Sequence, residues 1–411
     1  MDYRGVIITG TSGAGKTTIA RKLCESHEIF EIVQATTTRK QRNDDNPSEY
    51  QYINEDEFKK LDEEGALLIK SEYRGKYYGI TYEAFQRVIN KNKIPILIIT
   101  PKSIKEDENN KHYKQNKEEF RYFTVCLGEK QLLFFTIFLD ASDNILDGRL
   151  KQRGEEIDGT IKEQRQEDRE YKDICLYTIE NLDGKNIGVE KVVELIRSLW
   201  KYRITGGVLP KRLIQLMIEC GLLLKSAELE NITGAAYDLS IGDEYYYGGK
   251  IKTLNDKQPF IMIEPYDYAI VTSKETANLS KDVAGRFDLS VSLFCQGIIL
   301  SNGPQVDPGF RGRLFCLLFN TSNAHVFLKL GQHYATLEFQ KLIEPTIPYQ
   351  GKYQDKEKIV YYLPSNTMKG AINELKKELE QVRRESQTLQ TIFMGVISLI
   401  FAIIGVLLVI R

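Results

Sequence analysis

A glycine-rich loop near the N-terminus constrains the fold of this chain more than any other feature. The stretch GVIITGTSGAGKTTIARKL reads as a buried strand, a loop and a helix. The loop places Gly10, Gly13 and Gly15 ahead of Lys16 and Thr17 in the pattern Gly-x-x-x-x-Gly-Lys-Thr. Loop amides and a helix N-terminus can surround phosphate groups, the lysine can reach the β and γ oxygens, and the threonine can hold Mg²⁺. The sequence therefore predicts a parallel α/β domain that binds ATP and Mg²⁺ through these residues.

The overall composition restricts the partners and the compartment. With 411 residues the chain has room for two or three domains. Its 56 basic and 57 acidic residues nearly cancel, so no nucleic acid is expected as a partner. Six cysteines are scattered without a Cys-x-x-Cys pair, which is typical of a reducing cytosol and not of a disulfide framework or a zinc site. No signal peptide is expected, because Met1 leads almost directly into a strand-like run.

The C-terminal stretch is strongly apolar. Residues 391–410, TIFMGVISLIFAIIGVLLVI, carry no charge. A helix of this length rises about 30 Å, which matches the hydrocarbon core of a bilayer. We expect a single-pass C-terminal transmembrane helix in the cell membrane, with a buried core helix as the alternative. Arg383 and Arg384 precede the apolar run, which favours cytoplasmic domains by the positive-inside rule.

Residues 367–390 carry a heptad pattern just before the apolar run. Apolar side chains recur at alternating steps of three and four, and one place is polar: Ile372, Leu375, Leu379, Val382, Ser386 and Leu389. Lys and Glu occupy the outer positions. The pattern predicts a coiled coil, with a lone amphipathic helix as the alternative. Because Ile, Leu and Val are mixed, this seam permits two or three helices.

Three further motifs follow the glycine loop in order: TTTRKQRNDDNPSEYQYINEDEF, LLIKSEYRGKYYGI and RLKQRGEEIDGTIKEQRQEDREY. In order and spacing they resemble guanylate kinases, and the run YTIEN is similar to that family's last core strand. The resemblance assigns residues 1–203 to one kinase-like domain. A charged segment at about 103–130 departs from the family pattern, and we expect a solvated loop there.

The resemblance implies two groups of phosphate-binding side chains. Arginine forks bind phosphate through two hydrogen bonds, and tyrosine hydroxyls add directional ones. The acceptor phosphate would be held by Arg39, Arg42, Tyr50 and Tyr78. The catalytic lid arginines, which with Lys16 stabilise the transferring phosphoryl group, would be Arg149, Arg153 and Arg165. Surface arginines on a solvated helix are the alternative for this trio; Arg169 repeats the same helical spacing.

The positions that read guanine in that family do not match. Where guanylate kinases carry a glutamate and an aspartate for the N–H donors of guanine, this chain has Ile69 and Thr100, and Ile80 replaces a serine. Ile98 replaces an acidic residue on the strand linked to the metal. Apolar replacement removes base readout, so we predict that GMP is not the preferred acceptor. The related ribose bisphosphate phosphokinases also lack these acids, which leaves another monophosphate or a sugar phosphate as acceptor.

A second domain is expected after TGGVLP, a Gly- and Pro-containing linker at 205–210. An amphipathic helix pattern, KRLIQLMIECGLLL, precedes the strand-like motifs AAYDLSIGDEYYY, AGRFDLSVSLFCQGIIL, VDPGFRGRLFCLLFN and LKLGQHYATLEFQKL. Together they resemble the dCTP deaminase and dUTPase superfamily over residues 208–345. The resemblance implies an all-β barrel or jelly roll and a homotrimer with sites between subunits. Residues 346–366 would then be a linker.

The catalytic positions of the deaminases are replaced in this chain. Their proton-shuttling glutamate falls on Leu317, and the serine and arginine that follow the Ala-Gly-Arg motif fall on Val291 and Cys295. Asp307 matches the water-activating aspartate of the triphosphatases, although an Asp-Pro-Gly turn favours aspartate without any function. We therefore predict a domain kept for fold, assembly or nucleotide binding and not for deamination.

Two functions fit these patterns. The first is a membrane-anchored, ATP-dependent phosphotransferase of the nucleoside monophosphate kinase type with a trimerising, non-catalytic second domain. The second is a nucleotide-sensing membrane effector, for example in anti-phage defence, with little or no turnover. A bifunctional nucleotide-pool enzyme would require catalysis in the second domain. The expected partners are nucleotides or phosphorylated small molecules, the membrane, and further copies of the chain.

Overall fold

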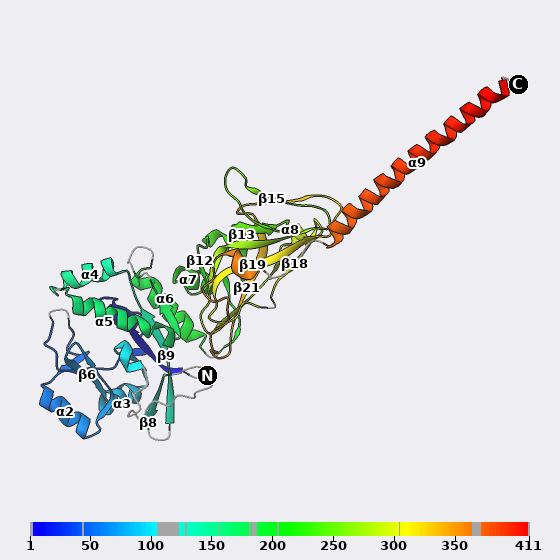
Figure 1. Ribbon diagram of the computed structural model, residues 1–411. Coiled ribbons are helices and arrows are strands. Elements are labelled where there is room, and N and C mark those ends of the chain that lie inside the picture. The colour runs from blue at the N-terminus through cyan, green and yellow to red at the C-terminus, as the bar shows by residue number, and fades with distance from the viewer. Residues whose placement is uncertain are drawn as a thin grey trace.

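Two folded regions and one long helix follow one another along the chain (Figure 1). The computed structural model describes residues 3–42, 45–104, 123–127, 130–155, 157–180, 182, 187–203, 205–303, 305–363 and 371–409. An α/β region lies beside a sheet-rich region, and helix α9 (Ala371–Val409) projects away from both (Figure 1). The predicted order of an α/β region, a sheet-rich region and an apolar C-terminal helix is confirmed.

The first region is built on a parallel sheet with the order β10-β9-β1-β7-β2. Its strands are β1 (Tyr3–Gly10), β2 (Phe30–Ile32), β7 (Ile94–Ile98), β9 (Lys130–Leu139) and β10 (Tyr177–Ile179). Neighbouring strands on this path pair in parallel. Val6, Ile7 and Ile8 in β1 are completely buried, as expected for a strand inside a sheet that is covered on both faces. The predicted parallel α/β fold is confirmed.

A smaller sheet stands beside the parallel one, with the order β4-β3-β6-β5. Its strands are β3 (Ala35–Thr37), β4 (Tyr50–Tyr52), β5 (Leu67–Tyr73) and β6 (Lys76–Thr81). Helices α2 (Glu55–Glu63) and α3 (Tyr82–Asn90) connect its strands to each other and to β7. The other helices of this region are α1 (Lys16–Ser26), α4 (Asp143–Gln152), α5 (Gly159–Glu170) and α6 (Val189–Lys201).

The segment expected as a solvated loop is partly a strand. Strand β8 (Phe123–Leu127) pairs antiparallel with the beginning of β9 and adds a sixth strand to the parallel sheet. The reason is the length of β9: its pairing with β1 starts only at Leu133, so its first residues need another partner. The prediction of a loop is therefore wrong for 123–127 and 130, and 105–122 lie outside the described residues.

The second region is an antiparallel sheet with the main order β11-β21-β13-β16-β19-β18. These strands are β11 (Gly207–Val208), β13 (Ala236–Tyr247), β16 (Tyr268–Asn278), β18 (Ile298–Ser301), β19 (Arg311–Asn320) and β21 (His333–Lys341). Side strands are β12 (Leu224–Lys225), β14 (Lys250–Thr253) and β17 (Val283–Leu289), and β15 (Phe260–Ile263) pairs with β20 (Val326–Lys329). The predicted amphipathic helix is α7 (Lys211–Glu219), and a short helix α8 (Val291–Phe294) precedes β18.

Two segments expected as linkers pack on this sheet instead. Strand β11, inside 205–210, pairs with β21. Lys356 forms an isolated β-bridge with Gly312. The 3-10 helix η4 (Ile359–Tyr362) stacks the Tyr362 ring on the Phe315 ring, with 4.0 Å between the ring centroids. One face of β19 is aromatic and apolar, so the chain that follows the sheet covers it and buries Ile359 completely. The described part of the expected linker 346–366 is thus packed structure, and 364–366 lie outside the described residues.

The two regions are joined by a buried contact. The Tyr177 hydroxyl, on β10, donates to Asp282 Oδ2 at 2.6 Å, and Asp282 is 1% exposed. Lys191 on α6 forms an ion pair of 3.1 Å with Glu219 at the end of α7. The apolar core also runs without interruption from the parallel sheet into the antiparallel one. The regions therefore pack against each other and are not separated by a free linker.

Helix α9 runs without a break through the segment predicted as a coiled coil and the segment predicted as a transmembrane helix. Its segment Lys377–Ile404 contains an 18-residue window with a mean hydropathy of 1.9, so the helix is long and apolar enough to cross a membrane, and none of that window is buried within the chain. Leu375, Leu379, Val382 and Leu389 are each more than 60% exposed. The helix is therefore not a core helix of this chain, whereas the coiled coil and the membrane span stay predictions. Residues 367–370 and 410 lie outside the described residues.

Candidate functional site

The glycine loop turns the chain from β1 into α1. Gly10, Gly13 and Gly15 have φ angles of 134°, 87° and 92°, which are left-handed values that other residues rarely adopt. A Cβ on Gly10 would lie 2.0 Å from the carbonyl oxygen of Leu139 in the neighbouring strand. The loop therefore needs glycine for both conformation and space, and it leaves the N-terminus of α1 open toward a ligand.

Lys16 is folded back onto this loop. Its Nζ donates to the carbonyl oxygens of Gly10 at 2.7 Å and Thr11 at 2.9 Å. Burial lowers the pKa of Lys16 to about 8, although the nearby Asp168 carboxylate opposes this effect. A ligand phosphate would offer charged acceptors in place of the two carbonyls and would raise this pKa again.

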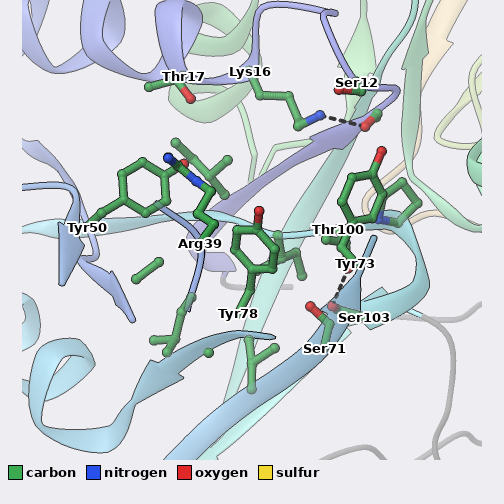
Figure 2. Close-up of a pocket in the computed structure, with 18 of the residues that line it drawn as sticks. Ser12, Lys16, Thr17, Arg39, Tyr50, Ser71, Tyr73, Tyr78, Thr100 and Ser103 are labelled. Atoms are coloured by element: carbon green, nitrogen blue, oxygen red, sulfur yellow. Dashed lines mark hydrogen bonds between the residues drawn. The ribbon is translucent and has the colours of Figure 1, made fainter. Parts of the chain in front are cut away.

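A cavity of about 140 Å³ opens beside the loop, between the parallel sheet and the smaller sheet. Lys16 and Thr17 lie at one end, Ser71, Thr100 and Ser103 at the other, and Tyr78 between them (Figure 2). The basic residues that line it are Lys16, Arg39, Arg42 and Arg153. None of the described residues that line it is an aspartate or a glutamate. The cavity therefore presents basic side chains that are suited to phosphate groups, although Asp45 and Glu155 form ion pairs with Arg39 and Arg42.

The predicted acceptor clamp gathers in this cavity. Arg39 stacks 4.6 Å above the Tyr50 ring and binds Asp45 through two hydrogen bonds of 2.6 and 2.8 Å. Burial alone would raise the pKa of Asp45, but the Arg39 guanidinium and the Tyr52 hydroxyl lower it to about 2. Asp45 thus fixes the Arg39 fork in the lining. The remaining predicted clamp residues, Arg42, Tyr50 and Tyr78, line the same cavity.

The predicted lid arginines take three different positions. Arg153 lines the cavity. Arg149 Nη2 donates to the carbonyl oxygen of Leu182 at 2.6 Å, and its Nη1 lies 3.3 Å from the carbonyl oxygen of Gly13 in the loop. Arg165 is 1% exposed and donates to Asp147 Oδ1 at 2.6 Å, while its Nε and Nη2 have no hydrogen-bond partner in the described part of the chain. Arg165 is therefore not a surface arginine on a solvated helix.

The far end of the cavity carries the residues at the lost guanine-reading positions. Ile69 and Ser71 on β5 face Ile80 and Tyr78 on β6 across an antiparallel pair, and all four line the cavity. Thr100 also lines it, and its Oγ1 lies 2.8 Å from Ser103 Oγ. Isoleucines and neutral hydroxyls therefore line this end of the cavity, and the loss of guanine readout stays a prediction.

One buried acid was missed by sequence reasoning. Asp168 on α5 is 1% exposed and accepts long hydrogen bonds from Gln164 Nε2 at 3.4 Å and from the Tyr73 hydroxyl at 3.5 Å. Tyr73 lines the cavity and also interacts with Ser12 of the loop. Burial raises the pKa of Asp168 to about 6. An acid in the charged run KEQRQEDREY resembles a solvated position, so the sequence alone contains no signal for this contact.

The second region does not bring its candidate residues into a polar site. Leu317 pairs across the sheet with Ile270 and belongs to an apolar cluster with Phe319 and Ile359. Val291 is 76% exposed on α8, and Asp307 is half-buried and accepts a hydrogen bond of 2.8 Å from Gln305 Nε2. Cys295 is exposed. Among the described residues, no group of three or more His, Cys, Asp and Glu side chains could hold a metal ion.

Comparison with known proteins gives two separate matches. A guanylate kinase family model matches residues 2–113, and a dCTP deaminase-like model matches residues 208–342. A guanylate kinase of Trichormus variabilis is 35% identical over 95 residues, or 23% of this chain and 48% of that protein. The chain therefore matches about half the length of this relative.

The second match, to the dCTP deaminases, covers most of the length of each relative. A dCTP deaminase of Pyrococcus horikoshii is 34% identical over 141 residues, or 34% of this chain and 89% of that protein. A dCTP deaminase of Thermococcus kodakarensis is 39% identical over 134 residues, or 32% of this chain and 85% of that protein. The chain belongs to the dCTP deaminase-like family through residues 208–342, and residues 2–113 ahead of them are similar to guanylate kinases.

Proposed function

We propose that the first domain is an ATP-dependent phosphotransferase of the nucleoside monophosphate kinase type. One observation carries the proposal: the cavity beside the glycine loop gathers four basic side chains, and its described lining contains no carboxylate. These basic side chains fit two phosphate-bearing ligands that face each other. The match to guanylate kinases over residues 2–113 supports the same chemistry.

The residues of the loop fit ATP and Mg²⁺. Three glycines with left-handed φ angles expose the loop amides, and buried Arg165 keeps two nitrogens without hydrogen-bond partners in the described chain, which suits an arriving anion. Lys16 would exchange its carbonyl partners for phosphate oxygens, and Thr17 would hold the metal. When bound, ATP supplies the phosphoryl group and Mg²⁺ offsets its negative charge.

The other basic residues have distinct proposed roles. Arg39, Arg42, Tyr50 and Tyr78 would bind and orient the acceptor phosphate. Arg153, together with Arg149 and Arg165, would stabilise the charge of the transferring group. Arg149 would act from its contact with the loop carbonyl of Gly13, and Arg165 after a change of partner from Asp147.

Calorimetric titration with ATP–Mg²⁺ tests the proposal. We expect binding by the wild type and its loss in Lys16→Ala, because no other side chain replaces the Lys16 ammonium at the loop. Lys22→Ala, an exposed lysine on the same helix that pairs with Glu25, is the matched control. Equal ATP affinity in the wild type and Lys16→Ala would exclude the kinase assignment.

A coupled ADP-release assay identifies the acceptor. We predict that GMP is not the preferred one, because Ile69, Ile80 and Thr100 offer no charged acceptor to the N–H groups of guanine. The panel contains nucleoside monophosphates and ribose phosphates. Turnover with GMP above every other acceptor would contradict the prediction.

A nucleotide-sensing membrane effector is the second candidate. It is favoured by the isoleucines at the far end of the cavity and by the apolar helix α9, which a pool enzyme would not need. The two candidates differ in turnover. ATP binding without ADP release for any acceptor in the panel would favour the sensor.

For the second domain we propose a non-catalytic role in nucleotide binding or assembly. Leu317 stands in an apolar cluster, and replacing a general acid–base group typically costs about 10²–10⁴-fold in rate. We expect no dUTP when the purified protein is incubated with dCTP and the products are separated by chromatography. Formation of dUTP in proportion to enzyme would disprove this role.

A further inference from the structure

The segment that directly follows helix α5 is held by the second domain. Lys281 Nζ donates to the carbonyl oxygen of Cys175 at 2.5 Å and to that of Asp173. Arg311 Nη1 lies 3.3 Å from Asp173 Oδ1, and Arg311 Nε donates to Asp355 Oδ1 at 2.8 Å. Asp173 belongs to the 3-10 turn η2 (Lys172–Ile174), which follows α5 directly after Tyr171. Two cations from the second domain therefore bind η2 and Cys175, just beyond the end of α5.

Helix α5 carries Asp168, which approaches the phosphate site, and Arg165. Asp168 approaches Tyr73 in the cavity wall, and its negative charge acts on Lys16. Arg165 lies one turn earlier and binds Asp147 on α4. Asp168 lies in the last turn of α5, and η2 begins only two residues after that helix ends. A displacement of η2 at its contact with the second domain would therefore also displace Asp168 next to the phosphate site.

The contact continues into the turn that contains Asp307. The Gly309 N–H donates to the carbonyl oxygen of Ser280 at 3.2 Å, and the Leu279 N–H donates to the carbonyl oxygen of Phe310 at 3.0 Å. Both partners are neighbours of Lys281 in sequence, and Arg311 directly follows the turn. The turn 307–310, residues 279–281 and the end of α5 thus form one series of direct contacts.

We infer that Lys281 and Arg311 are positioning residues for the phosphate site, because they fix the end of α5 and with it Asp168 and Arg165 relative to Lys16. Cations at a helix C-terminus are favourable, and hydrogen bonds to a charged donor are stronger than neutral ones. The second domain thereby acts on the first without any catalytic residue of its own. The kinetic part of this inference rests on the proposed function; the structural part does not.

The experiment compares full-length wild type with Lys281→Met, Lys281→Arg and Lys274→Met. Lys274 pairs with Glu228 on the surface of the same domain and serves as the matched control. Hydrogen exchange is measured across 159–170 without nucleotide, followed by ATP titration and steady-state kinetics. We expect the backbone amides of 159–170 to exchange about tenfold faster in Lys281→Met than in the wild type. The variant should also bind ATP about three- to tenfold more weakly. Its kcat should fall while the KM for the acceptor stays unchanged, and Lys281→Arg should restore these values.

The outcomes separate this inference from the proposed function. Unchanged exchange across 159–170 in folded Lys281→Met would overturn the inference, whatever the kinase assay shows. Faster exchange in a protein that never releases ADP would support the inference and count against the kinase. If Lys281→Met does not fold, Arg311→Gln is measured in the same way, because Arg311 is partly exposed and its loss leaves no buried charge from its own side chain.

Discussion

Asp168 is a buried carboxylate near the half-buried Lys16, in a helix whose sequence is mostly charged. Burial raises its pKa from 3.8 to about 6. Because the folded pKa is the higher one, the charged form is disfavoured in the fold. The resulting cost is fully present above about pH 6 and disappears as the pH falls through this value toward 3.8.

Asp168→Asn should therefore stabilise the protein at neutral and alkaline pH. The amide oxygen can still accept hydrogen bonds from Tyr73 and Gln164, whereas the cost of burying the charge is gone. We expect the free energy of unfolding to rise on the order of 1–3 kcal/mol at pH 8 and by much less at pH 4.5. Urea unfolding at both pH values measures this, with the exposed Glu163→Gln as control. An equal gain at the two pH values would show that the effect is not electrostatic.

At the scale of the element, strand β19 carries the physical reason why we expect no deaminase chemistry. Its half-exposed face carries Phe315, Leu317 and Phe319, and η4 covers this face. A carboxylate at residue 317 would lie against Ile270 and Ile359. The catalytic glutamate cannot be restored without placing a charge in an apolar cluster.

Leu317→Glu should consequently destabilise the second domain and produce no dUTP. We expect the free energy of unfolding to fall on the order of 2–4 kcal/mol. Leu317→Gln, which has the same shape without the charge, should lose less. Thermal unfolding of both variants and chromatography after incubation with dCTP check the prediction. A Leu317→Glu protein as stable as the wild type would contradict the packing of this face.

The segment 346–363 should behave as part of the second domain. Truncation after residue 345 removes Ile359 and Tyr362 and exposes Phe315 and Leu317 to water. We expect this protein to bind a hydrophobic dye and to aggregate, because an apolar patch of several aromatic and aliphatic side chains is left uncovered. Truncation after residue 366 keeps the cover and should remain soluble, so equal solubility of the two proteins would argue against the packing.

At the scale of the whole molecule, we propose a homotrimer anchored in the membrane by α9. The heptad series from Ile372 to Leu389 could continue a three-fold bundle from the second domain to the bilayer. Deleting 391–411 should release a soluble trimer, and deleting 367–411 shows whether the second domain trimerises alone. Light scattering that gives a monomer for both would contradict the trimer. Full-length protein in a lysate supernatant without detergent would contradict the anchor.

The sequence by itself determined the features that depend only on residues close together in the chain. The glycine loop is one of them, because left-handed φ angles and a close approach to Leu139 demand glycine at fixed spacing. Helices α7 and α9 are others, since their apolar periodicity needs no distant partner to be recognised. The motifs that resemble guanylate kinases also named residues that the fold brings into one cavity, such as Arg39, Tyr78 and Arg153.

Only the tertiary structure decided which residues are buried and which distant segments contact each other. In the folded chain Asp168 is buried near Lys16, and Arg165 donates a hydrogen bond to Asp147. Strand β8 pairs with β9, and η4 packs on β19. The tertiary structure also placed Lys281 just beyond the end of α5, 106 positions from Cys175 in sequence. Propensity and periodicity describe one segment at a time, whereas burial and pairing are properties of two segments that the folded chain brings together.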